Sequence, residues 1–411
     1  MKHGYLQPFA KKKTFLQPHK IRPCQNSRLM PTPTELHDQL KAHQELVLAN
    51  ALMLGEFPSP SGAENDRINF LAQRFASLQD VSIDEQGNLQ AIIPGKNPEF
   101  NVLIAAHADT LLTQKPEQRN TINVGPEGIT GPGMADNTIG LAALATIPDL
   151  LERLDIQPEA NLILLAHTKS QNSHDLAGLR FFLENFKRPI HTGLVLEGIT
   201  LGRLNHSCLG MVQADVICRV HQEPGTRWEA AENAMIIMHR IIRRILEIPI
   251  PQEPRTSVIL GSLRAGKTFN RPPELARLKL EIRSEEPGKA REIRHQISGI
   301  LDEISSETAS DCSITFPALR KPGGIPFNHP LVAAAREVHN ELGVKTTTGP
   351  SYSDLSILIE HNIPALTVGL TTATNLNESD ETVALEPLFT GLAQVFGILQ
   401  KVDTLESELT L

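Results

Sequence analysis

Four residues that can bind a metal or hold a metal ligand in place lie next to apolar or helical segments. His107 and Asp109 directly follow one apolar run, Glu197 follows another, and Asp136 lies in a Gly-rich loop ahead of a helical pattern. A His and an Asp two residues apart can act together, because the carboxylate holds the imidazole ring while the second ring nitrogen binds a metal. Each signal is weak by itself, since Asp is also a preferred helix N-cap residue and a polar residue at a strand end is usually only solvated.

Two more polar segments lie beside apolar runs. Residues 167–175 include His167, His174 and Asp175, and residues 375–381 include an Asn-Leu-Asn-Glu sequence. Both segments also fit ordinary surface loops.

The apolar runs that carry these residues are short and continuous rather than alternating. Continuous runs are typical of strands covered on both faces. Helical patterns over 138–154 and 176–186 separate them, which predicts an α/β fold with a mostly parallel sheet and helices on both faces. Ligands of such sheets collect beyond the carboxyl ends of the strands, where the polar residues above lie. The runs are 102–106, 162–166, 194–196 and 365–370.

The middle of the chain follows a different pattern. Residues 213–220 and 278–283 alternate apolar and polar side chains, which predicts strands with one solvated face. Helical patterns over 234–246 and 290–304 accompany them. We therefore expect residues 206–317 to form a smaller α+β lid or dimerisation domain, inserted into an α/β domain made of residues 35–205 and 318–411.

The first 30 residues hold seven Lys/Arg and no acidic residue, whereas the whole chain has a net charge of -8. We expect a disordered basic tail over 1–34 or an extension ahead of a start at Met30, with a targeting peptide as the alternative. The remaining chain is strongly acidic and should repel nucleic acid. No apolar window reaches the roughly 18 residues of a membrane span, so we predict no membrane partner and a cytoplasmic location.

The four cysteines, Cys24, Cys208, Cys218 and Cys312, are widely spaced and contain no Cys-x-x-Cys pair. This spacing argues against a disulfide framework and against a thiolate zinc site.

From about residue 35 to the end, the order of motifs resembles the zinc-dependent exopeptidase and deacylase family of peptidase T, succinyl-diaminopimelate desuccinylase and acetylornithine deacetylase. The combination is much more specific than any single motif. In the α/β part the matching segments are 58–64, 87–89, 107–110, 133–137 and 362–364. In the insertion they are 270–276, with an Asn-x-x-Pro pattern, and 282–283.

The resemblance implies two zinc ions bridged by an Asp, with a separate Glu as general base. Carried over by motif, His107 and Glu197 would hold the first ion, Asp136 would bridge, and Asp109 would orient His107. The family's lid also implies a homodimer, with either an exposed sheet edge or the apolar stripe 238–245 as the contact. That stripe is equally typical of a domain core.

Other residues that the family's chemistry requires are replaced. The family's Glu-Glu pair falls on Ser170 and Gln171 or on Gln171 and Asn172, so the general base is lost at Ser170 or Gln171. The family's last His falls on Asn377. An amide binds zinc weakly and cannot accept a proton near neutral pH. Gln171, Asn172 and Asn377 are therefore predicted to be degenerate metal positions.

These replacements predict a metallopeptidase-family protein, of the exopeptidase or N-acyl amino acid amidohydrolase type, with an incomplete di-zinc site and weak or no hydrolysis. We expect one zinc ion at most, or none, on His107, Asp136 and Glu197. A first alternative is a working one-zinc hydrolase with replacement ligands from His167, His174 or Asp175. A second alternative is a non-catalytic structural or regulatory partner.

The expected ligand is a peptide or an acyl-amino acid. By resemblance, Asn270, Arg283 and His221 of the insertion would grip its carboxylate and carbonyl groups, a task that suits the bidentate donors of Arg. Arg283 also lies in an alternating segment, where a solvated strand position is the plainer interpretation.

Overall fold

The computed structural model describes residues 31–111, 118–126, 128–171, 174–221, 233–308 and 310–405. The basic tail and Asn172 therefore lie outside the described residues, apart from residues 31–34 of the expected tail. Within the described part, α1 begins at Pro33 with Thr32 as its N-cap.

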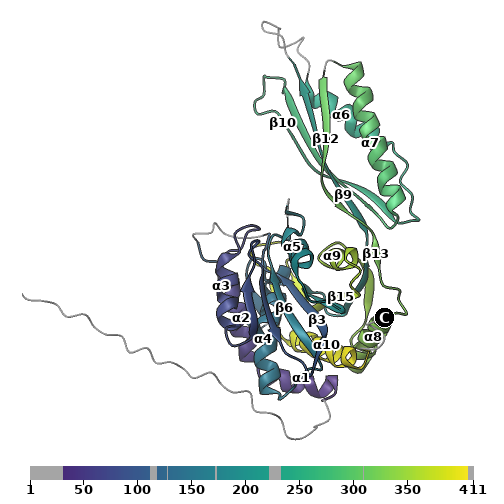
Figure 1. Ribbon diagram of the computed structural model, residues 1–411. Helices are drawn as coiled ribbons and strands as arrows, with labels where there is room; N and C mark the ends of the chain where they lie inside the picture. Colours follow the sequence, from purple (N-terminus) through teal and green to yellow (C-terminus); the bar gives the residue numbers. More distant parts are fainter. Residues whose placement is uncertain are drawn as a thin grey trace, which may run out of the picture. The chain divides into compact units, whose positions relative to one another are not determined.

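The large sheet has nine strands. They are β1 (Gln79–Ile83), β2 (Leu89–Ile93), β3 (Asn97–His107), β6 (Ala160–His167), β7 (Thr192–Ile199), β8 (Arg203–Cys208), β13 (Gly323–Gly324), β14 (Thr347–Ser351) and β15 (Ala365–Thr371). Their order is β1-β2-β6-β3-β7-β15-β8-β13, with β14 also paired to β8. Figure 1 shows the paired central strands β6 and β3 side by side. The central pairs β6-β3, β3-β7 and β7-β15 are parallel, whereas β1-β2, β2-β6, β15-β8 and β13-β8 are antiparallel.

Helices cover both faces of this sheet, and successive residues of β3 show why its sequence is continuously apolar. Val102 and Ile104 pack into one hydrophobic cluster, whereas Leu103 and Ala105 pack into another on the opposite face. The prediction of a mostly parallel α/β sheet with helices on both faces is confirmed. The helices are α1 (Pro33–Lys41), α2 (Gln44–Glu56), α3 (Asn65–Arg74), α4 (Ile139–Arg153), α5 (Ala177–Asn185), α8 (Pro330–Glu341), α9 (Leu355–Glu360) and α10 (Glu386–Thr404).

The larger of the two clusters draws residues from both ends of the chain. It contains Leu36 and Leu54 from the first helices together with Val338 and Phe396 from the last ones. The two outer segments of the sequence thus share one hydrophobic core.

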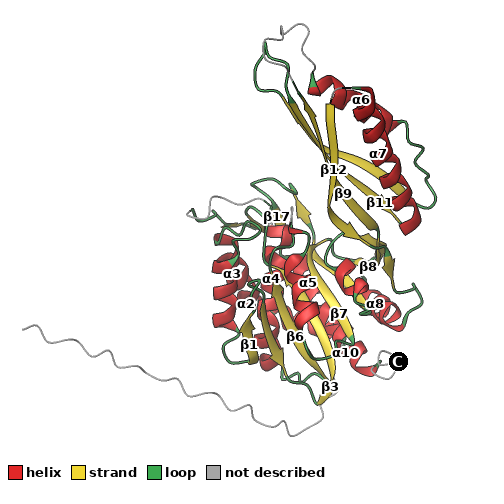
Figure 2. Ribbon diagram, turned by 45° about the horizontal axis from the view of Figure 1, so that its top comes forward, coloured by secondary structure: helices red, strands yellow, loops and turns green. Residues whose placement is uncertain are grey.

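A second, four-stranded sheet occupies the middle of the sequence. Its strands are β9 (Gly210–Val220), β10 (Thr256–Ala265), β11 (Leu275–Ser284) and β12 (Ser310–Arg320). They pair antiparallel in the order β10-β11-β9-β12, and α6 (Ala234–Leu246) and α7 (Pro287–Glu307) lie along one face (Figure 2). Exposed and buried residues alternate along β11, as expected for a sheet with one covered face.

The apolar stripe of α6 belongs to the core of this second unit. Met238, Ile241 and Ile245 are buried in its hydrophobic cluster, while Ile236 and Leu246 are exposed. Of the two interpretations of the stripe, the domain core is therefore the one that the structure shows.

A small sheet lies beside the polar loops. Its strands are β4 (Asn123–Val124), β5 (Gly128–Thr130), β16 (Ala373–Thr374) and β17 (Thr382–Ala384), in the order β16-β17-β5-β4. Pairing of β17 with β5 brings the segment around residue 381 to the Gly-rich loop that precedes Asp136. None of the described helices has both the length and the apolar composition of a transmembrane helix.

Candidate metal centre

The register of two parallel strands brings His107 and Glu197 together. Ala105 of β3 pairs with Val195 of β7, and each polar residue lies two positions farther along its strand. Side chains alternate between faces with a period of two, so both polar side chains point to the same face. Asp136 reaches this point from the helical turn Met134–Thr138, which leads into α4.

His107, Asp136 and Glu197 form one compact group. Each offers a ligand atom, and these atoms all lie within 4.8 Å of one another. Nε2 of His107 is 3.1 Å from Oδ1 of Asp136. The His107 and Glu197 side chains are buried, whereas Asp136 is 40% exposed, so the group opens to solvent on the Asp136 side.

Asp109 holds His107 mainly through its main chain. Nδ1 of His107 is 2.9 Å from the Asp109 carbonyl oxygen and 3.3 Å from Oδ1 of the same residue. With Nδ1 engaged, Nε2 is the ring nitrogen that faces Asp136 and is available to an ion. The Asp109 carboxylate also accepts, through Oδ2, the backbone N–H groups of Ser170 and Gln171 at 2.9 and 2.8 Å. Asp109 therefore fixes both the His107 ring and the start of the loop after β6.

Asn137 ties Asp136 to Glu197. Its side-chain amide donates to the carbonyl of Leu196 at 2.7 Å and accepts from the N–H of Gly198 at 2.8 Å, which are the two neighbours of Glu197 in β7. Because Asn137 directly follows Asp136, one side chain sets the separation of two potential ligands.

The charge state of the group reflects its burial. Burial raises the pKa of Glu197 to about 7, although His107 opposes the shift. Burial disfavours protonated His107, but hydrogen bonds to Asp109 and Asp136 outweigh that effect and hold the pKa of His107 well above its usual value. Burial also works against ionised Asp109, yet contact with His107 lowers the pKa of that carboxyl. The ion-free group therefore retains protons that a cation would displace.

Comparison with known proteins gives the chain a family. The sequence pattern of Peptidase family M20/M25/M40 matches residues 103–401. The chain belongs to this family. Comparison with curated proteins found no match.

Solved structures of the M20 family and related enzymes share the fold. Aminopeptidase PepT from Bacillus cereus is 17% identical with a TM-score of 0.70, over 87% of this chain and 98% of that chain. The dipeptidase Dug1p from Saccharomyces cerevisiae is 10% identical with a TM-score of 0.73, over 90% and 98%. The YXEP protein of Bacillus subtilis, described as a dinuclear metal-binding peptidase of family M20, is 16% identical with a TM-score of 0.62, over 88% and 98%.

The places predicted to hold the second metal ion in this M20 protein carry amide side chains at Gln171 and Asn377. Gln171 directs its amide nitrogen at Asp136, with Nε2 3.2 Å from Oδ2. Asn377 is exposed, and its backbone N–H faces Oε1 of Glu381 at 3.4 Å. Asn172 lies outside the described residues. Asp136 thus faces His107 through Oδ1 and accepts a hydrogen bond from the Gln171 amide through Oδ2.

The residues proposed as replacement ligands make other contacts. His167 is buried, with Nδ1 3.0 Å from Oγ of Ser170 and Nε2 3.2 Å from Oδ2 of Asp354. His174 contacts the hydroxyl of Ser61 at 2.9 Å. Asp175 accepts from Nε of Arg320 at 2.7 Å. Among the described residues none of the three joins the metal group.

The motifs assigned no role to Ser353, which contacts Glu197, or to Glu381, which contacts the N–H of Ala135 beside Asp136. Oγ of Ser353 donates to Oε1 of Glu197 at 3.0 Å. Glu381 is buried, its Oε2 accepts from the N–H of Ala135 at 3.0 Å, and burial raises its pKa. Glu381 lies in the polar segment 375–381, so its place in the sequence was a signal, whereas Ser353 lies outside the polar segments described above.

The three predicted substrate anchors lie in the middle of the sequence, away from the metal group in the chain. Asn270 and His221 are exposed. Nε of Arg283 donates to Oε1 of Glu281 at 2.5 Å, and its guanidinium lies 4.3 Å from the ring centre of Tyr352. Arg283 therefore has two partners and is more than a solvated strand residue.

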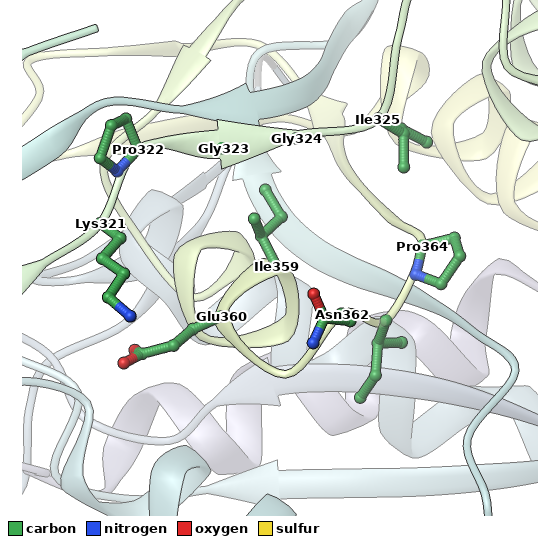
Figure 3. A pocket seen from close by; sticks show the side chains of 10 residues that line it. Lys321, Pro322, Gly323, Gly324, Ile325, Ile359, Glu360, Asn362 and Pro364 are labelled. Carbon is green, nitrogen blue, oxygen red and sulfur yellow. The ribbon is translucent and has the colours of Figure 1, made fainter. Parts of the chain in front are cut away.

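A hollow of about 570 Å³ lies beside β13 and the end of α9 (Figure 3). Lys321, Gly323, Ile359, Glu360 and Asn362 are among the residues that line it. Its lining contains none of the three metal-group residues, so the hollow is separate from the candidate centre.

Proposed function

We propose that this M20-family protein binds one divalent ion, zinc by its donor set, on His107, Asp136 and Glu197, and hydrolyses peptides or N-acyl amino acids weakly or not at all. The convergence of these three side chains within 4.8 Å carries the proposal. The amide contact between Gln171 and Asp136 supports the restriction to one ion.

The donor set fits zinc. Zinc accepts imidazole nitrogen and carboxylate oxygen ligands, and a catalytic zinc site has three protein ligands and one open position. Two ligands at about 2.1 Å from one ion lie at most about 4.2 Å apart. Ligand atoms within 4.8 Å of one another therefore need only a small side-chain rotation to meet a common ion.

A zinc ion, when bound, supplies Lewis-acid polarisation of a substrate carbonyl. This chain's residues do the rest. Asp109 holds the His107 ring, and Asn137 holds Glu197 at a fixed distance from Asp136. At the position of the family's base, the amide of Gln171 and the hydroxyl of Ser170 cannot take up a proton near neutral pH. Loss of a general base commonly lowers the rate by about 10²–10⁴-fold.

Metal content and restoration of the lost residues together test the proposal. We expect the purified protein to bind one zinc ion per chain and to show little turnover of dipeptides, tripeptides and N-acyl amino acids. The triple variant Gln171→Glu, Asn172→Glu and Asn377→His should raise the zinc content towards two. The single variant Asn375→His is a matched control from the same exposed loop. If the unchanged protein binds two zinc ions and cleaves dipeptides at an ordinary enzymatic rate, the proposal is wrong.

We also propose that two copies of the chain associate through the second sheet. In the described part of the chain β10 is an edge strand that pairs with β11, and it carries exposed Ile259 and Leu263. Such an edge can pair with the same strand of another copy. Sedimentation should show a dimer at micromolar concentration, and a monomer there would contradict this proposal.

A further inference from the structure

Two cysteines that are far apart in the sequence face each other in the second sheet. Cys218 of β9 and Cys312 of β12 are direct register partners on neighbouring antiparallel strands. Both are free thiols. Cys218 is fully buried in the hydrophobic cluster under α6 and α7, and Cys312 is partly buried against the same cluster.

The strand geometry suits a bond between them. Direct partners on antiparallel strands have Cα atoms about 4.5–5.5 Å apart, and disulfides usually join Cα atoms about 4.4–6.8 Å apart. As direct register partners, both side chains leave the sheet on the same face and pack on the same hydrophobic cluster. A disulfide could therefore form without rearrangement of the sheet.

We propose that Cys218 and Cys312 form a thiol modification site that reacts with a small disulfide, such as oxidised glutathione, to give a reversible bond between β9 and β12. This site is independent of the metal group. Among the described residues β12 is an edge strand of this sheet and pairs with β9, so the bond would join that edge covalently to the sheet.

Exposure sets the order of the two steps. The partly exposed Cys312 thiolate attacks the oxidant, which forms a mixed disulfide and releases one reduced glutathione. The Cys218 thiolate then attacks the Cys312 sulfur and releases a second. Each protein thiol loses one proton, the two sulfurs are oxidised, and one molecule of oxidised glutathione is reduced to two thiols.

The acidity of the two thiols differs in the direction that this order needs. Interaction with Cys218 lowers the pKa of the Cys312 thiol, whereas interaction with Cys312 and burial raise the pKa of Cys218. Cys208 is a natural comparison. Its buried Sγ lies 3.6 Å from the carbonyl of Lys321, and burial raises its pKa to about 11.

The full-length protein carrying Cys24→Ser, with Cys208 kept as an internal reference, is exposed to oxidised glutathione and analysed by peptide mass spectrometry. We expect one peptide pair joined through Cys218 and Cys312, a loss of two hydrogens, and recovery with dithiothreitol. Cys312 should react at least about tenfold faster than Cys208.

Single substitutions separate the two roles. Cys218→Ser should leave a stable glutathione adduct on Cys312, whereas Cys312→Ser should leave Cys218 unmodified in the folded protein and reactive in denaturant. A lasting adduct on Cys312 in the parent, links only between chains, or no oxidation of a folded protein whose denatured thiols react would each overturn the proposal. Zinc content is not part of this outcome, so failure here leaves the proposed function untouched.

Discussion

Replacement of Glu197 by Gln should change how zinc binding depends on pH. Burial raises the pKa of this carboxyl to about 7, so at neutral pH about half of the ion-free molecules carry a proton there. A zinc ion must displace that proton. Below pH 7 this single group should therefore reduce the apparent affinity about tenfold per pH unit.

His107 adds to the pH dependence of zinc binding. Its pKa is also raised, so the parent protein should lose more than one proton per zinc ion bound near pH 6. Glu197→Gln should lower the number of protons released per zinc ion by about one. The variant should also lose more affinity than the about 10–100-fold typical for removal of a partner that only supports a ligand.

The raised pKa of Glu197 also determines how the stability of the folded protein changes with pH. The folded, ion-free protein holds the Glu197 proton more tightly than the unfolded chain, whose carboxyl titrates near 4.5. Its contribution to stability is therefore fully present below pH 4.5 and is lost as pH rises towards about 7. The loss is on the order of 3 kcal/mol at most. Glu197→Gln should flatten this part of the stability profile.

Zinc competition titrations between pH 6 and 8, with calorimetry in buffers of different ionisation enthalpy, measure the affinity and the proton release. Asp403→Asn is the matched control, because burial raises the pKa of Asp403 as well, but its carboxylate faces the N–H groups of Glu159 and Ala160. An affinity that does not change with pH, or a pH dependence that survives Glu197→Gln unchanged, would refute this reasoning.

Three further substitutions test the surroundings of the group. Asn137→Ala should reduce zinc affinity by about 10–100-fold, because Glu197 loses both flanking hydrogen bonds, and titration of the variant measures this. Arg67→Met should lower the unfolding free energy by about 2–4 kcal/mol in urea denaturation, since the fully buried guanidinium donates to the Ala108 carbonyl at 3.0 Å. If Arg283 anchors a ligand, Arg283→Ala should weaken binding of any peptide ligand found by calorimetry; an unchanged affinity would end that role.

Much of the fold could be predicted because burial on two faces leaves a direct record in the sequence. Strands such as β3 are apolar at every position since alternate residues enter different hydrophobic clusters, whereas β11 alternates because one of its faces is solvated. The motif order likewise singled out His107, Asp136 and Glu197, because each residue follows a recognisable element.

Contacts between distant segments were decided only by the tertiary structure. Its residue type and its place at the end of β6 allowed His167 as a replacement ligand, but its two ring nitrogens face Ser170 and Asp354. The support that Asn137 gives to Glu197 was equally invisible in the sequence.

The two cysteines of the second sheet show the same division. Their spacing in the sequence argued against a disulfide framework, and the structure has both as free thiols. That Cys218 and Cys312 nevertheless face each other depends on the register of β9 and β12. Residue types and local periodicity determine which segments become strands and which faces are buried. Register between segments that are far apart in the chain is set by how whole sheets and helices pack, and that packing decides which side chains meet.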